Sequence, residues 1–266
     1  MLSNKFGKLG AFAATETGAG SDMTSVSAVA YENGDSYLIS GSKQYITNAG
    51  LAEINIVLAS SDPSRKRAGL DLFIVPSDIP GISPGRIEDK MGLRAAQVGE
   101  IVMDRVRVPK ENLIGGHNTG LLLSMQTLDL TRPALGVSAT GIARAAFETA
   151  LEYTRERIQF GKPIFKKQAI SFALADMATT IDAARFLNWR ACDLIDHDKE
   201  FTKEASMAKL FATESAERIC SQALHLTGAK GFTHCMLIEK YLRDIQGMVV
   251  IEGTSETQRY FIAAEL

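Results

Sequence analysis

The sequence predicts an α+β protein of more than one domain, in which a small antiparallel β sandwich or barrel precedes an antiparallel bundle of four to five helices. Up to about residue 117, short runs rich in β-branched and aromatic residues alternate with turn residues, and long helical patterns fill the rest. The 266 residues are enough to bury a large core in two domains. We therefore predict a β domain over residues 1–116 and a helical domain over residues 117–266.

Five segments of the first domain are predicted strands because they are rich in residues that suit a half-buried pleated surface. They are residues 25–31, 36–40, 54–60, 70–75 and 100–108. Asn33-Gly34-Asp35 is typical of a hairpin turn between the first two strands. Prolines and glycines between residues 76 and 85 indicate loops. The regular spacing of short strands favours a compact antiparallel sandwich or barrel.

The second domain contains four long predicted helices and a final shorter one. They cover about 119–156, 166–196, 202–227 and 234–247, with the last one running from Ser255 onward. Pro133 marks either a start or a kink in the first helix. In the second, Leu174, Met177 and Ile181 begin an apolar stripe at helical spacing. The loops are short, as expected in an antiparallel bundle.

Composition argues against several classes of function. Lys and Arg number 29 against 31 Asp and Glu, so no global basic field attracts nucleic acid. No apolar run approaches the roughly 18–20 residues of a membrane span, and residues 1–9 lack a signal-peptide apolar centre. Cys192, Cys220 and Cys235 are scattered, which predicts reduced, mostly buried thiols in the cytoplasm or an organelle matrix. The four histidines show no metal-ligand spacing, so we expect no metal site.

Glu252 is the first candidate catalytic residue. Ser255 and Gln258 have the spacing of a capping box, so we expect a helix to start directly after this carboxylate. Gly253 gives the turn freedom and lets a ligand approach the backbone. A carboxylate in such a turn suits the abstraction of a proton next to a carbonyl group. The alternative is that Glu252 is a solvated loop acid.

Residues 15–22, Thr-Glu-Thr-Gly-Ala-Gly-Ser-Asp, form a second candidate site. Glycines and hydroxyl side chains in a loop expose backbone N–H groups to a ligand, anionic or rich in carbonyls. The run is not a Rossmann fingerprint, because its glycine spacing differs and no strand-then-helix pattern surrounds it. The alternative is a plain connecting loop.

Several motifs in register resemble the acyl-CoA dehydrogenase family, and the resemblance covers nearly the whole chain from about Gly10. These motifs are residues 15–22, Tyr45-Ile46-Thr47-Asn48, residues 157–161 (Arg-Ile-Gln-Phe-Gly), Arg243-Asp244 and residues 251–259. The resemblance implies that both domains hold FAD and that Glu252 removes the α-proton of an acyl-CoA. The β-hydrogen would leave as hydride to N5 of the flavin, giving a trans-2-enoyl thioester.

The resemblance also implies the site residues. The backbone N–H of Glu252 and a ribityl hydroxyl of FAD would bind the thioester oxygen and stabilise the developing enolate. Arg132 resembles an arginine beside the base that favours its ionised form; the alternative is a surface arginine at a helix start. In chain order, the resemblance implies that Thr15 and Ser21 contact the flavin and the pantetheine arm and that Tyr45 and Thr47 cover the isoalloxazine ring. It further implies that Arg157 and Phe160 contact the FAD of a neighbouring subunit, and that Thr254 and Glu256 contact the adenosine end.

The sequence departs from the family pattern in three places. His225 stands where Gln is common and Gly228-Ala229 where Gly-Gly is common, in a segment that would contact the neighbouring subunit's FAD. The alternative for His225 is a packed core histidine. Ile251 replaces a frequent Tyr, which alters the wall of the acyl pocket. The family's N-terminal helical domain is not in this sequence, so we expect a truncated product, a gene fragment or a subunit whose partner supplies that part.

The implied partners are an acyl thioester of CoA or of an acyl carrier protein, an acceptor of the electron-transfer flavoprotein type, and further copies of the chain in a homotetramer or dimer. Three hypotheses follow. The chain is an active FAD-dependent acyl-CoA dehydrogenase, or a non-catalytic assembly subunit or inactive fragment, or an enzyme with the same chemistry but another acceptor or direction, as in acyl-CoA oxidases and enoyl-CoA reductases.

Overall fold

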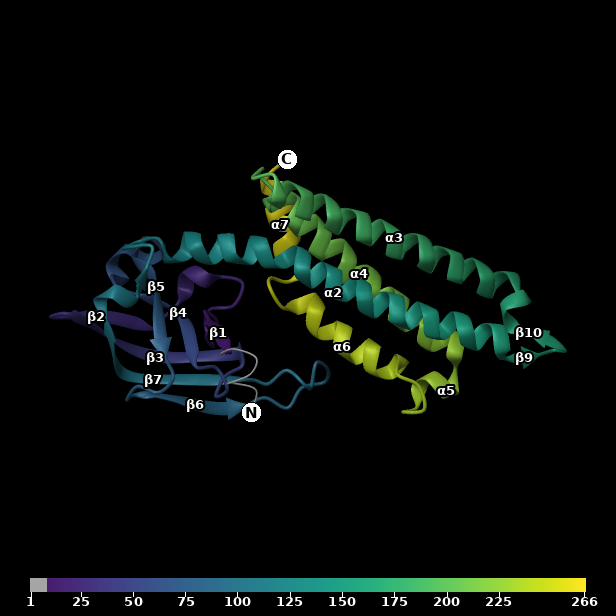
Figure 1. The fold of residues 1–266 in the computed structure, drawn as a ribbon, viewed down its shortest axis with the longest axis horizontal. Coiled ribbons are helices and arrows are strands. Elements are labelled where there is room, and N and C mark those ends of the chain that lie inside the picture. Colours follow the sequence, from purple (N-terminus) through teal and green to yellow (C-terminus); the bar gives the residue numbers. More distant parts are fainter. Residues whose placement is uncertain (1–8) are drawn as a thin grey trace. The chain divides into compact units, whose positions relative to one another are not determined.

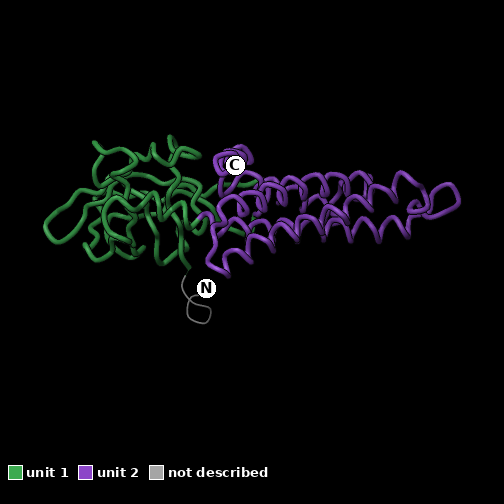
Figure 2. Tube along the Cα trace, turned by 90° about the horizontal axis from the view of Figure 1, so that it is seen from above, with its two compact units in different colours: residues 1–90, 94–127 green, residues 91–93, 128–266 purple. Residues whose placement is uncertain are grey.

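The computed structural model describes residues 9–266, which form two compact units (Figure 1, Figure 2). Unit 1 comprises the chain up to Lys90 with residues 94–127, and unit 2 comprises residues 91–93 with residues 128–266. Unit 1 holds a sheet and unit 2 a helical bundle, which confirms the predicted α+β class. Residues 1–8, where most of the segment assessed for a signal peptide falls, lie outside the described residues.

Within the described residues, unit 1 contains an eight-stranded sheet of order β6-β7-β3-β2-β4-β5-β8, with β1 paired to β4 outside this path. Most neighbouring pairs are antiparallel, but β1 and β2 each pair with β4 in parallel, which was not predicted. The strands are β1 (Gly10–Ala13), β2 (Val29–Asn33), β3 (Ser36–Thr47), β4 (Ile54–Ser60), β5 (Leu70–Pro76), β6 (Ile82–Ile87), β7 (Val98–Pro109) and β8 (Leu113–Ile114). Three 3-10 turns, η1 (Met23–Ser25), η2 (Pro63–Gly69) and η3 (Lys110–Asn112), lie between them.

The five predicted strands all overlap observed strands, whereas β1, β6 and β8 were not predicted. The first predicted strand begins late, at Val29, because Asp22 caps the turn η1 and holds the preceding residues out of the sheet. The predicted hairpin is confirmed. Asn33 pairs with Ser36, and Gly34 takes a φ of 65° between them.

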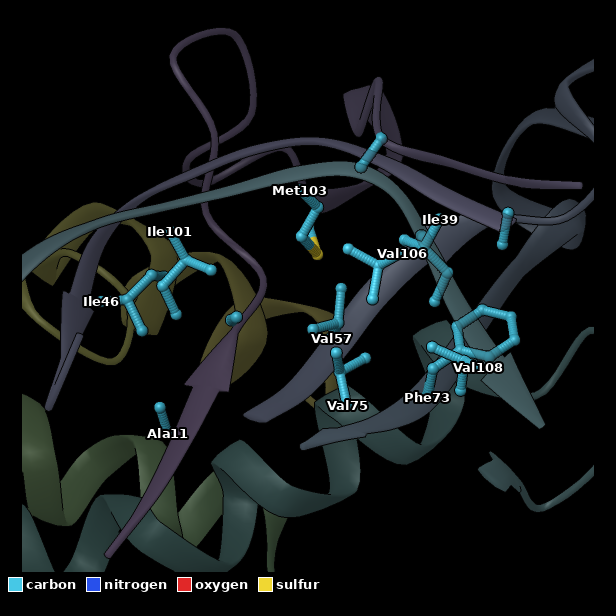
Figure 3. Packing of buried hydrophobic residues seen from close by; sticks show 14 of the residues in the cluster. Ala11, Ile39, Ile46, Val57, Phe73, Val75, Ile101, Met103, Val106 and Val108 are labelled. Atoms are coloured by element: carbon cyan, nitrogen blue, oxygen red, sulfur yellow. The ribbon is translucent and has the colours of Figure 1, made fainter. Parts of the chain in front are cut away.

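The core of unit 1 is made of apolar side chains that project from facing strands (Figure 3). Ile39, Val57, Phe73 and Val106 are among its fully buried members. Strand β3 breaks its regular alternation in this region, with register shifts against β7 after Ile39 and again before Ile46. Tyr45 lies at the second shift with a φ of 56° and is 61% exposed. The irregular strand therefore turns this ring away from the core.

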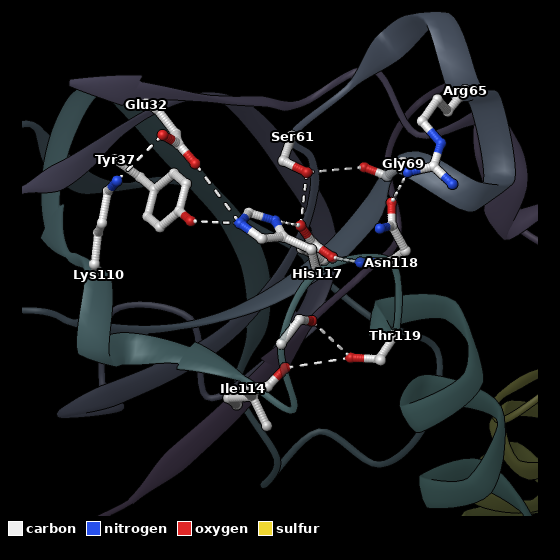
Figure 4. A network of polar contacts seen from close by, with 12 residues as sticks. Glu32, Tyr37, Ser61, Arg65, Gly69, Lys110, Ile114, His117, Asn118 and Thr119 are labelled. Carbon is white, nitrogen blue, oxygen red and sulfur yellow. Dashed lines mark hydrogen bonds and ion pairs between the residues drawn. The ribbon is translucent and has the colours of Figure 1, made fainter. Parts of the chain in front are cut away.

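A polar network around buried Asp71 ties the chain that enters α2 to the sheet (Figure 4). The carboxylate accepts hydrogen bonds from the Ser61 hydroxyl at 2.6 Å and from the Asn118 backbone N–H at 2.5 Å. His117 Nδ1 lies 2.9 Å from the same carboxylate, and its Nε2 lies 3.1 Å from the Tyr37 hydroxyl. These contacts fix the start of the longest helix.

Unit 2 is built from long helices joined by short connections (Figure 1). In the described chain they are α2 (Gly120–Glu156), α3 (Gln168–Asp196), α4 (Thr202–Thr227), α5 (Ala229–Phe232), α6 (Ile238–Val250) and α7 (Ser255–Ala264), with a small hairpin of β9 (Ile158–Gln159) and β10 (Lys162–Pro163) and the turn η4 (Ile164–Lys166) after α2. The predicted helix over 234–247 begins later, at Ile238, because the short helix α5 and a loop precede it. Pro133 lies inside α2, so its interpretation as a helix start is wrong.

Helix α4 is the centre of unit 2 and contacts α3, α6 and α7. Its inner face is a buried alanine stripe at helical spacing, made of Ala205, Ala208, Ala212 and Ala216. Small side chains allow neighbouring helices to approach closely. Lys209 lies on this same stripe and is fully buried. The predicted apolar stripe of α3 is also buried at Leu174, Met177 and Ile181.

Two negative findings apply to residues 9–266. No described helix is long and apolar enough to cross a membrane. No group of three or more His, Cys, Asp or Glu side chains in this part of the chain is placed to hold a metal ion. The three cysteines are free, but only Cys220 is buried, whereas Cys192 is half-buried and Cys235 exposed. The prediction of mostly buried thiols is therefore wrong, since Cys235 falls in the loop before α6.

Replacement of Gly41 by Ala should destabilise unit 1 by about 2–4 kcal/mol. Its φ is 146°, and a Cβ atom there would lie 2.6 Å from the Cβ of Ala28. Urea unfolding measures the effect. The control is Gly141→Ala in α2, where no atom lies within 4 Å of the added Cβ and the change should stabilise by up to about 1 kcal/mol. Equal stabilities for the two variants would contradict the close approach of β3 to Ala28.

Candidate active site

Glu252 lies in the turn between α6 and α7, in a backbone conformation that few residues favour. Its φ is 54° and that of Gly253 is 93°, in the left-handed region that non-glycine residues rarely adopt. Thr254 caps α7, since its hydroxyl accepts a hydrogen bond from the Thr257 N–H at 3.3 Å. Ser255 is the first helical residue, so the capping box predicted at Ser255 is wrong.

Gln258 stabilises the turn in a way that its spacing did not predict. Its buried side-chain amide donates to the carbonyl oxygens of Glu252 at 3.0 Å and Gly253 at 3.1 Å. The backbone on the C-terminal side of Glu252 is thereby held to α7.

The Glu252 carboxyl group is largely removed from water. Its Oε2 atom is buried and has no hydrogen-bond partner among the described residues. Burial raises the pKa of this carboxyl, while the Thr131 hydroxyl and the positive charges of Lys209 and Arg132 oppose the rise. These surroundings do not fit a solvated loop acid. They leave an oxygen lone pair available to accept a proton.

Arg132 is fully buried in the interior of α2, so its interpretation as a surface residue at a helix start is wrong. Its guanidinium pairs with Asp129, lies 3.4 Å from the Ser206 hydroxyl and stacks over the Phe261 ring at 4.7 Å. Burial lowers its pKa, while the negative charges of Asp129 and Glu252 oppose that change. A buried guanidinium in this position favours the ionised form of Glu252.

Lys209 is a further site residue that the sequence analysis missed. Its ammonium group donates to the carbonyl oxygen of Val249 at 2.8 Å and to that of Gly253 at 2.9 Å. Burial lowers the pKa of Lys209 to about 8, while the Glu252 carboxylate opposes the shift. The signal for it was present, because a lysine within a helical stripe of alanines is expected to be buried and paired.

In unit 1, the loop of residues 15–22 is fixed by a buried ion pair that was also not predicted. Lys43 Nζ lies 2.6 Å from Glu16 Oε1, and the Lys43 side chain is 0% exposed. The same carboxylate accepts hydrogen bonds from the N–H and hydroxyl of Ser27 and from the N–H of Ala28. Burial raises the pKa of Glu16, but its hydrogen bonds and the Lys43 charge outweigh this, so the net pKa is lowered.

The predicted cofactor contacts of unit 1 come from two adjacent segments. The backbone N–H of Gln44 donates to the Thr15 carbonyl at 2.8 Å, which places the loop beside β3. Thr15 is half-buried and Ser21 exposed, and Tyr45 and Thr47 both present exposed side chains on β3. A loop with free hydroxyls next to an exposed aromatic ring is suited to a flat, polar ligand.

Thr254 and Glu256 line a cavity of about 400 Å³ in unit 2. The other residues that line it are Glu214, Glu217, Arg218, Val249, Val250 and Ser255. The cavity therefore adjoins the turn that carries Glu252, and both predicted adenosine-end residues face it.

The remaining predicted cofactor contacts lie away from Glu252. Arg157 and Phe160 belong to the hairpin after α2, at the end of the bundle opposite α7 (Figure 1). Both are exposed, Phe160 by 89%. His225 and Gly228, at the end of α4, are exposed too, so the alternative of a packed core histidine is wrong. Within one chain these four residues do not join the Glu252 site.

Fold and site together define a class of protein. A helical unit holds a poorly solvated carboxylate beside two buried cations, and a β unit presents an exposed tyrosine next to a hydroxyl-rich loop. Comparison with known proteins identifies the class. The acyl-CoA dehydrogenase middle-domain model matches residues 11–106, and the acyl-CoA dehydrogenase C-terminal-domain model matches residues 118–266. The chain belongs to the acyl-CoA dehydrogenase family.

Individual relatives support this assignment. The mitochondrial short-chain specific acyl-CoA dehydrogenase of Rattus norvegicus is 44% identical over 97% of this chain and 63% of its own length. The CarC subunit of the caffeyl-CoA reductase-Etf complex of Acetobacterium woodii is 41% identical, over 96% of this chain and 68% of its own. The structure of butyryl-CoA dehydrogenase from Megasphaera elsdenii matches with a TM-score of 0.96 and 40% identity, over 97% of this chain and 68% of its own. The chain thus spans about 63% of the rat relative.

Glu16→Gln should destabilise unit 1 by about 3–5 kcal/mol, because it leaves the buried Lys43 ammonium without a counter-charge. The double variant Glu16→Gln with Lys43→Met should recover most of this loss, since no charge then stays buried and unpaired. Denaturant unfolding of the three variants gives the comparison. The control is Asp35→Asn, which removes an exposed partner of Arg107 and should change stability by at most about 1 kcal/mol. If Glu16→Gln lost no more stability than Asp35→Asn, the stabilising role of the Glu16–Lys43 ion pair would be refuted.

Proposed function

We propose that this chain forms the catalytic part of an FAD-dependent acyl-CoA dehydrogenase that introduces a double bond between the α and β carbons of an acyl thioester, with Glu252 as the base. The Glu252 carboxyl carries the proposal, because its Oε2 atom is buried and unpartnered in the described structure. An oxygen kept out of water and out of any hydrogen bond is available to a substrate proton.

The residues around Glu252 would perform two tasks. The positive charges of Arg132 and Lys209 oppose the rise in pKa that burial causes, which favours the ionised form of the base. The hydrogen bonds from Gln258 hold the strained turn, so the carboxylate has a fixed direction. The backbone N–H of Glu252 would donate to the thioester oxygen, where negative charge develops as the proton leaves.

One similar solved structure is that of a protein named an FAD-dependent dehydrogenase, and the described residues fit FAD. The exposed Tyr45 ring offers an aromatic face, the hydroxyls of Thr15, Ser21 and Thr47 offer polar contacts, and Thr254 and Glu256 face a cavity. When bound, FAD would accept the β-hydrogen as hydride at N5. The exposed Arg157, Phe160, His225 and Gly228 would serve the FAD of a neighbouring copy, which supports a dimer or tetramer.

The acceptor of the electrons would be a protein of the electron-transfer flavoprotein type, because one relative is a subunit of a complex named for Etf. That relative is named a reductase, so the opposite direction of the reaction stays a second candidate. The three free cysteines support a reducing compartment, the cytoplasm or an organelle matrix. A non-catalytic assembly subunit is a third candidate, because His225 and Ala229 depart from the family pattern in a segment expected to contact FAD.

Glu252→Gln should slow the reduction of bound flavin by acyl-CoA by a factor of about 10²–10⁴ or more, while the flavin content stays unchanged. The amide keeps the shape of the side chain but has lost its basicity. Anaerobic bleaching of the flavin absorbance with a panel of acyl-CoAs measures the effect. Glu111→Gln makes the same substitution at an exposed residue of η3 that no part of the proposed site includes; it is the control and should still bleach. Loss of flavin from Glu252→Gln would show that Glu252 is structural instead.

The rate of flavin reduction should depend on pH through Glu252. Because only the carboxylate accepts a proton, the rate should be full above the folded-state pKa and fall as pH decreases through it. Burial raises that pKa, so the decline should begin above the value of about 4.3 typical of an ordinary Glu. Stopped-flow reduction over a pH series gives the profile. A reduction rate that does not change until the pH falls to that ordinary value would contradict the raised pKa.

A further inference from the structure

Lys209 reaches the catalytic turn from helix α4 and binds it on both sides of Glu252. Val249 O, three residues before Glu252, accepts at 2.8 Å, and Gly253 O, directly after it, accepts at 2.9 Å. Between these two points the chain takes a φ of 54° at Glu252, a conformation that persists only where the surroundings determine it. Two hydrogen bonds from a charged donor supply that determination together with the two that Gln258 donates to the carbonyls of Glu252 and Gly253.

A lysine at this place is costly for the fold. It is fully buried on the alanine stripe of α4, and burying an ammonium group disfavours its charged form. An apolar side chain would fill the same space without that penalty. Packing of the alanine stripe therefore does not require a charged side chain, whereas the carbonyl oxygens that Lys209 binds do require a hydrogen-bond donor.

The charge of Lys209 is also available to Glu252. Arg132 forms a direct ion pair with Asp129, so its charge is shared. Lys209 forms no direct ion pair among the described residues, and its hydrogen-bond acceptors are neutral carbonyls. The charged groups that act on it are Glu252 first, then Arg132, Glu214 of α4 and Glu256 of α7. Of the carboxylates among them, Glu252 interacts most strongly with Lys209.

We propose that Lys209 is the positioning residue of the Glu252 base: its buried ammonium clamps the α6–α7 turn through the carbonyls of Val249 and Gly253, which flank Glu252, and supplies a positive charge that acts on the Glu252 carboxyl group. This inference rests on the proposed function only in so far as it assigns Glu252 as the base. The clamp and the charge effect are properties of the polypeptide that can be measured without turnover.

Lys209→Met and Lys209→Gln separate the two effects. Met removes the charge and the hydrogen bonds, whereas Gln keeps a donor for one carbonyl but carries no charge. Lys203→Met is the matched control, because it makes the same substitution on the same helix at a half-buried lysine for which the described residues show no hydrogen bond or ion pair to the turn. Folding of each variant is followed by circular dichroism, and Lys209→Gln replaces Lys209→Met in every comparison if the latter does not fold.

The first measurement is the titration of the Glu252 carboxyl by ¹³C NMR in Glu-labelled protein, assigned with Glu252→Gln. Loss of the cation should raise the Glu252 pKa in both Lys209 variants and leave it unchanged in Lys203→Met. Hydrogen exchange of residues 249–254 should accelerate in Lys209→Met and less in Lys209→Gln. An unchanged Glu252 pKa together with unchanged exchange would overturn the proposal, whether or not the protein turns over an acyl-CoA.

The second measurement is the anaerobic rate of flavin reduction as a function of pH. Lys209→Met should react about 10- to 100-fold more slowly, with its pH profile displaced upward, and Lys209→Gln should recover part of the rate but keep the displaced profile. A purely structural lysine would change stability and leave the profile in place, which would refute the positioning role. Failure of the wild-type protein to bleach would refute the proposed function alone, because the NMR titration tests the clamp independently.

Discussion

The structure of the helical unit depends most on the interaction between a poorly solvated carboxyl group and two buried cations: Oε2 of Glu252 is buried without a hydrogen-bond partner among the described residues, and the charges of Arg132 and Lys209 act on it. Burial raises the pKa of the Glu252 carboxyl group. The fold opposes this rise by bringing cations from two different helices, Arg132 on α2 and Lys209 on α4, close enough to act on it. The packing of the helices is therefore tied to the electrostatics of one side chain.

Unit 1 contains a buried charge arrangement of the opposite kind. The Glu16 carboxylate is satisfied by Lys43, Ser27 and the N–H of Ala28. Nothing is left over for a ligand, so this pair shapes a loop and takes no part in chemistry. The contrast with Glu252, whose Oε2 has no partner among the described residues, separates a carboxylate that holds structure from one that can react.

The main divisions of the fold were predictable because they rest on periodicity. Strands β2, β3, β4, β5 and β7 and helices α2, α3 and α4 follow the patterns of their own residues. Strand β6, with the sequence Ile-Ser-Pro-Gly-Arg-Ile, carries turn residues within the strand and gave no such pattern. The capping box failed because Thr254 and Ser255 are both competent caps, and only the tertiary position of Gln258 decides between them. The buried charges Glu16 and Lys43 were missed because a charged residue in a single sequence is expected in solvent unless its partner is known. Lys209 differs, since its place within the alanine stripe of α4 indicates burial.

The most direct test of Glu252 as the base is exchange of the α-proton of an acyl-CoA, followed by ¹H NMR in D₂O with the flavoprotein reduced and anaerobic. Under these conditions no oxidation competes, and only proton removal and return are observed. The wild-type protein should exchange the α-protons, and Glu252→Gln should exchange them at no more than the rate of the solution without protein. Equal exchange by the two proteins, or none by the wild type with acyl-CoA bound, would contradict the assignment of Glu252.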